Sequence, residues 1–233
     1  MYSKDTFDNF ASLNNIIKLL KKDSSFNSHC QQEKIVKGDM VELADAYNVY
    51  FYIIQSGCMK YNHDLNSTSE FQFLISAGDM PLMRPYVQEL HHRPVCTALV
   101  DTIWWKIDFP FFKKRLLEED PKNIILVHQI ELTRKKLYGN YLKNLLSSRQ
   151  RVLFSLVELV AGKVPREPNV MELPDYLNYN ILAELSSTSK NYTSDILSDL
   201  RKQDILVSTK KPWIIADMEK FRALTTSENL PYL

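Results

Sequence analysis

The side chains best suited to chemistry lie together in one short polar stretch near residue 190. If a helix begins at Lys190, steps of about 100° per residue put its polar side chains on one side. These are Lys190, Asn191, Ser194, Asp195 and Ser198. The opposite side is apolar and carries Ile196, Leu197 and Leu200. Ammonium, amide, hydroxyl and carboxylate groups in one row can bond the donors and acceptors on base edges in the major groove of DNA.

A preceding short helix and a tight turn would position this row. Leu182, Ala183 and Leu185 share one face of a helix that Asn178 can cap, and the polar residues 186–189 then interrupt the apolar pattern. Two helices joined by such a turn predict a helix-turn-helix whose second helix, starting near Ser189, enters the major groove. The alternative is an ordinary helical hairpin packed in a core, with a solvated polar face.

The segment after the second helix predicts a β-hairpin. Ile205–Ser208 and Trp213–Ile215 have strand composition and flank the turn Thr209–Pro212. Such a hairpin forms a wing beside a helix-turn-helix, with Lys210 and Lys211 at its tip. We expect these two lysines, together with Lys202, to contact DNA phosphates.

The composition describes a folded chain with almost balanced charge. Among 233 residues there are 29 Lys and Arg against 28 Asp and Glu, so net charge gives no support to nucleic-acid binding. Any DNA-binding surface must therefore arise from local placement of charge. No apolar run is long enough to span a membrane and the first residues lack a secretory signal, so we expect a cytoplasmic protein without membrane contact.

The cysteines and histidines do not indicate a cofactor. Cys30, Cys58 and Cys96 are odd in number and widely spaced, which argues against a disulfide framework, a structural zinc site and an iron–sulfur cluster. The adjacent His91 and His92 would point to opposite faces of a strand, whereas a metal enzyme of the cupin type needs clustered ligands. We find no catalytic motif and predict no enzyme, no metal and no cofactor.

The first half of the chain predicts one helix followed by an antiparallel roll. Apolar residues recur at steps of three and four from Thr6 to Lys22, as in an amphipathic helix. From Glu33 to Ile107, short runs of Val, Ile, Phe and Tyr are separated by turn residues. Strands at this spacing suggest a closed antiparallel roll or barrel.

A long helix is predicted from about Lys122 to Leu146, with two apolar faces. One face, including Ile125 and Leu132, would pack against the roll. The other face roughly follows a coiled-coil seam, interrupted by Arg134, and predicts a homodimer. Its seam residues are Val127, Ile130, Leu137 and Tyr141. The next residues, 147–150, would form a hinge, and Arg151–Val160 the first helix of a second domain, followed by a loop at 162–174.

This order of elements resembles the Crp/Fnr family of bacterial transcription regulators over nearly the whole chain. The residues that carry the resemblance are Lys37–Asp39, Tyr52–Gly57, Ser76–Asp79, Gln150–Val152, Leu182–Leu185 and Ile196–Leu206. The resemblance implies an α+β protein with three parts. A β-roll of cyclic-nucleotide-binding shape occupies residues 1–120, a dimerisation helix 121–147, and a winged helix-turn-helix 148–233. It also implies a homodimer on a palindromic operator in double-stranded DNA, with RNA polymerase as a further partner.

Two places in the roll depart from the family's cyclic-nucleotide sensors. Leu82 and Met83 stand where those proteins have a Gly-Glu pair, and Arg93 falls near their Arg-Ser pair. Met83 cannot accept a hydrogen bond from a ribose hydroxyl, and Leu82 adds bulk where the backbone should approach a phosphate. The sequence is therefore similar to divergent members such as the PrfA-like regulators. Arg84 and Arg93 still allow an anionic effector, whose identity is not predicted.

The recognition helix departs from the family pattern as well. Lys190, Asn191 and Asp195 occupy positions where many members have Arg, Glu and Arg, so the half-site should differ from the common one. Ser186–Thr188 replace the usual glycine of the turn. Two other functions remain open: a cupin-type metal enzyme, and a small-molecule or protein-binding module without DNA affinity.

Overall fold

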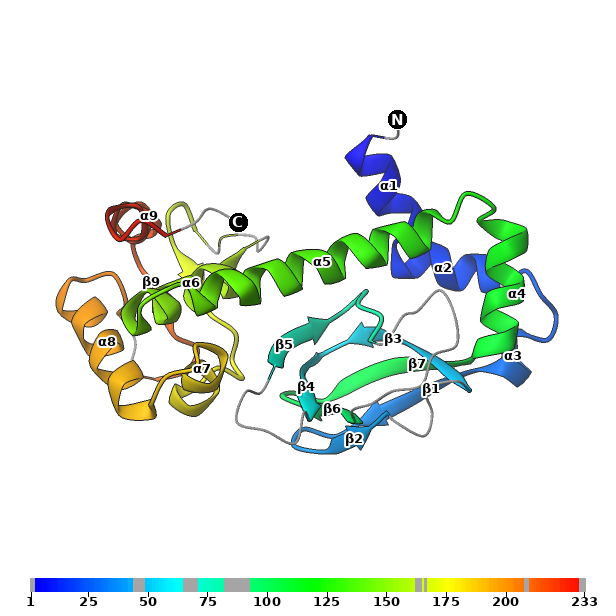
Figure 1. The fold of residues 1–233 in the computed structure, drawn as a ribbon, viewed down its shortest axis with the longest axis horizontal. Coiled ribbons are helices and arrows are strands. Elements are labelled where there is room, and N and C mark those ends of the chain that lie inside the picture. The colour runs from blue at the N-terminus through cyan, green and yellow to red at the C-terminus, as the bar shows by residue number, and fades with distance from the viewer. Residues whose placement is uncertain are drawn as a thin grey trace. The chain divides into compact units, whose positions relative to one another are not determined.

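The computed structural model describes residues 3–43, 49–64, 71–81, 93–161, 165, 167–207 and 210–230 (Figure 1). The chain divides into two compact units, Met1–Leu137 and Tyr138–Leu233, called unit 1 and unit 2 below. Each unit is described by itself. In the described residues, no helix is both long and apolar enough to cross a membrane.

Unit 1 begins with three short helices, α1 (Lys4–Phe10), α2 (Leu13–Leu20) and α3 (Phe26–His29). The prediction of one helix over Thr6–Lys22 was therefore wrong. The Ser12 side chain accepts a hydrogen bond from the backbone N–H of Asn15, so a second helix starts where the first ends. The apolar spacing continues across this break, which is why periodicity alone did not reveal it.

Two antiparallel sheets follow, as the sequence predicted. One has the strand order β1 (Cys30–Ile35), β7 (Thr102–Asp108) and β3 (Tyr50–Ser56). The other has the order β2, β6, β4 and β5. Its strands are Met40–Glu42, Arg93–Ala98, Cys58–Asp64 and Phe71–Ser76, respectively. The strand β2 is the shortest of these, with three residues.

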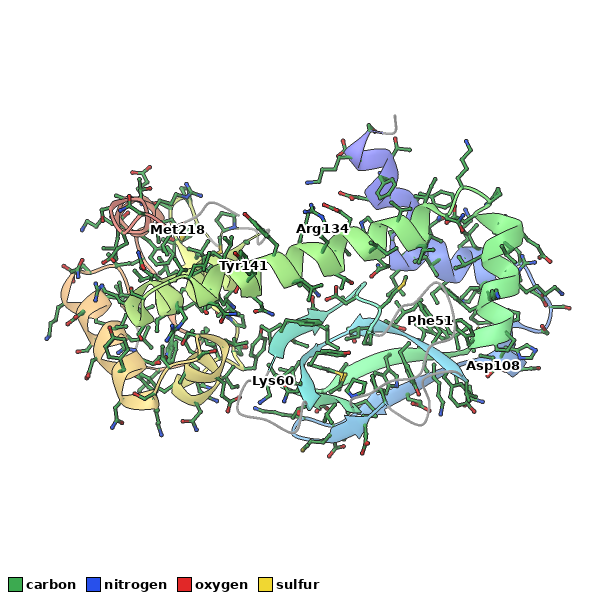
Figure 2. All side chains as sticks on the ribbon, in the orientation of Figure 1. Phe51, Lys60, Asp108, Arg134, Tyr141 and Met218 are labelled. Carbon is green, nitrogen blue, oxygen red and sulfur yellow. The ribbon has the colours of Figure 1, made fainter. Side chains whose placement is uncertain are left out.

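The side chains of β3 alternate between two cores. Tyr52 and Ile54 point between the sheets, where they pack with Trp104 and side chains of β4, β5 and β6. Phe51 and Ile53 point to the other face, which the helices cover. The Phe51 ring (Figure 2) stacks on Phe112 with 3.9 Å between centroids. This alternation gives the three-stranded sheet two buried faces.

All three cysteines lie in unit 1, in the described part of the chain, and each is a buried thiol rather than half of a disulfide. Cys30 belongs to the helix-side core and Cys96 to the core between the sheets. Burial raises the pKa of both thiols to about 12. Thiols of this kind are protected from alkylation and oxidation in the folded protein.

The roll leads into α4 (Phe109–Glu119) and the long helix α5 (Ile124–Asn144), which continues from unit 1 into unit 2. The buried Asp120 carboxylate accepts hydrogen bonds from the N–H groups of Ile124 and Ile125, at 2.9 and 2.8 Å, and so begins α5. Farther along, Gln129 donates to the Gly78 carbonyl, and Lys136 pairs with Asp79 at 2.6 Å. The helix thus contacts the β5 turn through polar groups.

Unit 2 contains α6 (Ser148–Val160), β8 (Met171–Glu172), α7 (Tyr179–Leu185), α8 (Lys190–Lys202), β9 (Ile214–Ile215) and α9 (Met218–Ser227). The predicted hinge at 147–150 is instead the start of α6. Ser147 and Gln150 form a reciprocal capping box there. The prediction of a loop over residues 162–174 missed β8, which pairs with β9.

Candidate nucleic-acid interface

The helix α8 has one buried and one exposed side. Thr193, Ile196, Leu197 and Leu200 are buried. The predicted contact residues Lys190, Asn191, Asp195, Ser198 and Lys202 are exposed, and Ser194 is half-buried. Ser189 is also exposed, but its side chain caps the helix by accepting a hydrogen bond from the N–H of Tyr192 at 3.2 Å. The structure therefore brings the predicted polar row together on one helix face.

The turn between α7 and α8 is built without glycine. Ser187 adopts φ +49°, in the left-handed region that glycine normally occupies. The hydroxyls of Ser186, Thr188 and Thr193 form a chain with 2.8 Å between successive oxygens. These bonds tie the turn to the first turn of α8, so serine and threonine side chains replace the missing glycine by adding local hydrogen bonds.

Two cations hold the backbone of this turn. The Arg151 guanidinium of α6 donates to the carbonyls of Ser186 and Ser187 at 2.9 and 3.1 Å. The Lys143 ammonium of α5 donates to the Leu185 carbonyl at 3.3 Å. Carbonyls at the end of a helix lack partners within the helix and carry partial negative charge, so cations are favourable there. Neither residue was predicted to support the turn, although Arg151 belongs to a segment that carries the family resemblance.

The end of α8 carries a small charge network. Arg149 lies 3.6 Å from Asp199 and 3.0 Å from Glu228, while Lys202 lies 3.7 Å from Asp199. Asp199 therefore faces two cations, which offset the negative charge of its carboxylate. The Lys202 side chain remains three-quarters exposed.

The wing is shorter than predicted. Leu206 forms an isolated bridge with Ile215, and the N–H of Val207 donates to the Ile214 carbonyl at 3.1 Å. Among the described residues of the predicted strand, 205–207, the Ile205 carbonyl also accepts a hydrogen bond from the N–H of Ala216 at 2.9 Å. Residues 208 and 209 lie outside the described part. Lys210 and Lys211 are exposed beside the hairpin, where the sequence predicted the tip.

Two aromatic features of the interface were not predicted. Tyr192 lies in the first turn of α8 and is 40% exposed. The Arg201 guanidinium near the other end of α8 lies 5.9 Å from the ring centroids of both Tyr179 and Trp213. Tyr179 opens α7 and Trp213 precedes β9, so this cation–π contact joins three elements. The position of Tyr192 next to Asn191 on the polar side of the helix was the signal in the sequence that could have identified it.

The predicted effector residues cannot be placed as a pocket. Leu82, Met83 and Arg84 lie outside the described residues, and of Arg93 only the backbone is described, paired with Asp64 at the start of β6. A separate cavity of about 320 Å³ opens beside α1 and the start of α5. Its lining includes Phe7, Phe10, Pro121 and Ile124 and is mostly apolar.

Two histidines whose side chains the structure describes each contact a single carboxylate. His29 lies 2.6 Å from Asp108, and His128 lies 3.3 Å from Asp8. No group of three or more His, Cys, Asp or Glu side chains is arranged to hold a metal ion among the described residues. His91 and His92 fall outside that part of the chain.

The predicted seam of α5 is exposed along the helix. Val127, Ile130 and Leu137 are each about half-exposed, and Tyr141 is 59% exposed. Tyr138 and Leu145 extend the same apolar surface. Arg134, which interrupts the seam (Figure 2), is held by two hydrogen bonds to the Glu131 carboxylate. Several exposed apolar side chains along one face of a helix are typical of an interface.

Comparison with solved structures identifies the fold. A cyclic nucleotide-binding domain containing protein from Listeria monocytogenes superposes with a TM-score of 0.74 at 17% identity, covering 89% of this chain and 98% of that protein. CooA from Carboxydothermus hydrogenoformans superposes with a TM-score of 0.67 at 16% identity, and 94% of each chain is covered. A regulator of the Crp/Fnr family from Eubacterium rectale superposes with a TM-score of 0.57 at 15% identity, covering 90% of this chain and 93% of that protein.

The chain therefore has the fold of the Crp/Fnr transcription regulators, with the antiparallel sheets, long helix and C-terminal helices of that architecture. At these identities the likeness is one of fold. No protein-family model and no curated protein sequence matches the chain.

Proposed function

We propose that this protein is a homodimeric, sequence-specific DNA-binding transcription regulator of the Crp/Fnr type that acts in the cytoplasm. The observation that carries the proposal is the exposed polar face of α8, mounted on a helix-turn-helix whose turn is fixed by Arg151 and Lys143. A helix of this kind fits the major groove with its first residues toward the base edges.

The groups on α8 suggest how the half-site is recognised. Lys190 suits the O6 and N7 acceptors of guanine, and Asn191 can bond adenine through N6 and N7. Asp195 would accept from a cytosine amine. Ser189, Ser194 and Ser198 supply hydroxyls beside them, while Lys202, Lys210 and Lys211 would bind phosphates. The nearly neutral chain then owes its DNA affinity to this local set of groups.

The exposed seam of α5 supports a homodimer. Val127, Ile130, Leu137 and Tyr141 follow steps of three, seven and four, close to a coiled-coil heptad. Pairing of two copies along this seam would place two recognition helices on successive major grooves of a palindromic operator, roughly 34 Å apart. Ile130→Glu should then give monomers in sedimentation experiments, whereas exposed Lys135→Glu should leave dimers intact.

The roll is proposed to sense a signal and pass it through α5 to the DNA-binding unit, with RNA polymerase as a further partner. An anionic ligand near Arg84 and Arg93 remains our proposal for the signal. The three proposed parts are residues 1–120, 121–147 and 148–233.

The test is selection of bound fragments from a genomic library, followed by affinity measurements on the enriched sequence. Lys190→Ala and Asn191→Ala should each weaken binding by about tenfold or more and relax specificity at one base pair. Lys220→Ala, an exposed lysine of α9, is the matched control and should change little. If no sequence is enriched, or if binding is indifferent to both substitutions, the protein is a binding module without sequence-specific DNA affinity.

A further inference from the structure

Lys143 is buried although its side chain is charged. The residue is only 9% exposed, in the last turn of α5. Lysine is almost never buried at this depth unless its ammonium group has partners. Here it has three: the Leu185 carbonyl, the Glu158 carboxylate of α6, and the Phe154 ring, whose centroid lies 5.8 Å away.

The Leu185 carbonyl lies where a hydrogen bond can affect the direction of α8. Leu185 is the last residue of α7, directly before the turn that sets the direction of α8. The Ser155 hydroxyl of α6 donates to the same carbonyl at 3.3 Å. Two helices that precede the helix-turn-helix therefore converge on one acceptor, and α5 contributes the charged donor.

Gly139 permits this arrangement one helical turn earlier on α5. A Cβ atom at Gly139 would lie 2.9 Å from Oε1 of Glu158. The absence of a side chain there lets Glu158 lie against α5 and pair with Lys143. Gly139 and the ion pair of Lys143 with Glu158 thus belong to one contact between α5 and α6.

We infer that Lys143 is a positioning residue, through which the last turn of α5 fixes the pose of the recognition helix; this inference rests on the proposed function. Lys143 acts on DNA through the Leu185 carbonyl and the α7–α8 turn, which set where Lys190 and Asn191 meet the bases. A rotation of α5 at this point would move the turn, because the Lys143 bond joins the last turn of α5 to the end of α7.

The experiment separates this bond from the ion pair beside it. Glu158→Gln removes the carboxylate charge but leaves Lys143 facing Leu185. Lys143→Met with Glu158→Gln removes both charges together, so no unpaired charge is buried and the protein should fold. The comparison of these two variants isolates the Lys143 contact, and exposed Lys135→Met on the same helix is the control.

Three quantities are measured at one salt concentration. They are the affinity for the selected operator, the affinity for random duplex, and amide hydrogen exchange at residues 186–188. A shift in the pose of α8 impairs base contacts and leaves the charge-driven affinity for random duplex nearly unchanged. Simple destabilisation would lower both affinities by the same factor.

We expect the double variant to bind the operator about tenfold more weakly than Glu158→Gln, as for the loss of one charge-assisted hydrogen bond. Random-duplex affinity should stay within about twofold, and exchange at the turn should accelerate. Equal operator affinity in the two variants, or parallel loss of both affinities, overturns the inference.

Failure of the proposed function gives a different result. If the wild-type protein prefers no operator, the link to DNA recognition is overturned together with the proposed function. The exchange measurement then still decides whether Lys143 holds the turn: faster exchange in the double variant supports that hold, and unchanged exchange removes it.

Discussion

Two lysines of α5, seven positions or about two helical turns apart, attach this helix to two different turns. Lys136 pairs with the Asp79 carboxylate in unit 1, and Lys143 donates to the Leu185 carbonyl in unit 2. We call these the roll anchor and the turn anchor. The first ends on a side chain and the second on the backbone.

The difference between the anchors lies in what remains when the lysine is lost. Asp79 also accepts a hydrogen bond from the N–H of Ser76 at 2.7 Å, so its carboxylate keeps a partner without Lys136. Loss of Lys143 removes the cation that pairs with the Glu158 carboxylate, whose side chain is 31% exposed. Both lysines have a carboxylate and an aromatic ring as partners; Lys143 differs in being more buried, with 11% of its side chain exposed against 26% for Lys136, and in binding a main-chain oxygen.

The largest effect is expected from Arg151→Met, which removes the second cation of the turn. The carbonyls of Ser186 and Ser187 would lose their charged donor. The left-handed backbone conformation of Ser187 would then lack the hydrogen bond that helps to hold it. We expect the free energy of unfolding of unit 2 to fall by about 3 kcal/mol, from two charge-assisted bonds. Hydrogen exchange of the α7–α8 amides measures this loss.

Exposed Arg222→Met is the matched control for that variant. Alkylation of the three cysteines during urea unfolding reports on unit 1 alone, because unit 2 contains no cysteine. Its midpoint should not move. A loss below about 1 kcal/mol would mean that the turn keeps its conformation without the guanidinium.

A smaller change of opposite sign is expected from Ser187→Gly. The φ of +49° is strained for serine and not for glycine, although glycine loses more backbone entropy on folding. The net gain in unfolding free energy of unit 2 should be about 0.5–1 kcal/mol. Ser187→Ala keeps the strain and should give no gain, so equal stability of both variants would contradict the strain argument.

The smallest effect is expected at the roll anchor. Lys136→Met should lower the unfolding free energy of unit 1 by less than about 1 kcal/mol, because partly exposed ion pairs contribute little. The midpoint of cysteine alkylation in urea measures the change. High salt should shrink the difference from wild type. A cost well above about 1 kcal/mol would mean that the roll anchor contributes more than a partly exposed ion pair can.

Local patterns were enough to predict most elements of this fold. The apolar run that forms β3 and the apolar side of α8 depend on near neighbours, and both were visible in the sequence. The break at Ser12 was missed because apolar spacing continues across it. The strand β8 has two residues and is defined by its distant partner β9, so its sequence carries no pattern of its own.

The site shows the same division. The polar row that begins at Lys190 follows from helical spacing alone. The contacts of Lys143 and Arg151 that support the α7–α8 turn do not. Lys143 and Leu185 are 42 positions apart, and a lysine near the end of an exposed helix is usually solvated. Only the packing of α5 and α6 against α7 reveals that this lysine is buried and paired.

The acceptors of the turn are main-chain oxygens of Leu185, Ser186 and Ser187. Main-chain oxygens are present whatever amino acids occupy α8. The hydrogen bonds from Lys143 and Arg151 to the turn therefore do not depend on the outward-facing side chains of α8. Substitutions at positions such as 191 or 195 can then change operator preference while the support stays intact. A protein built this way can acquire a new target sequence through a handful of surface replacements.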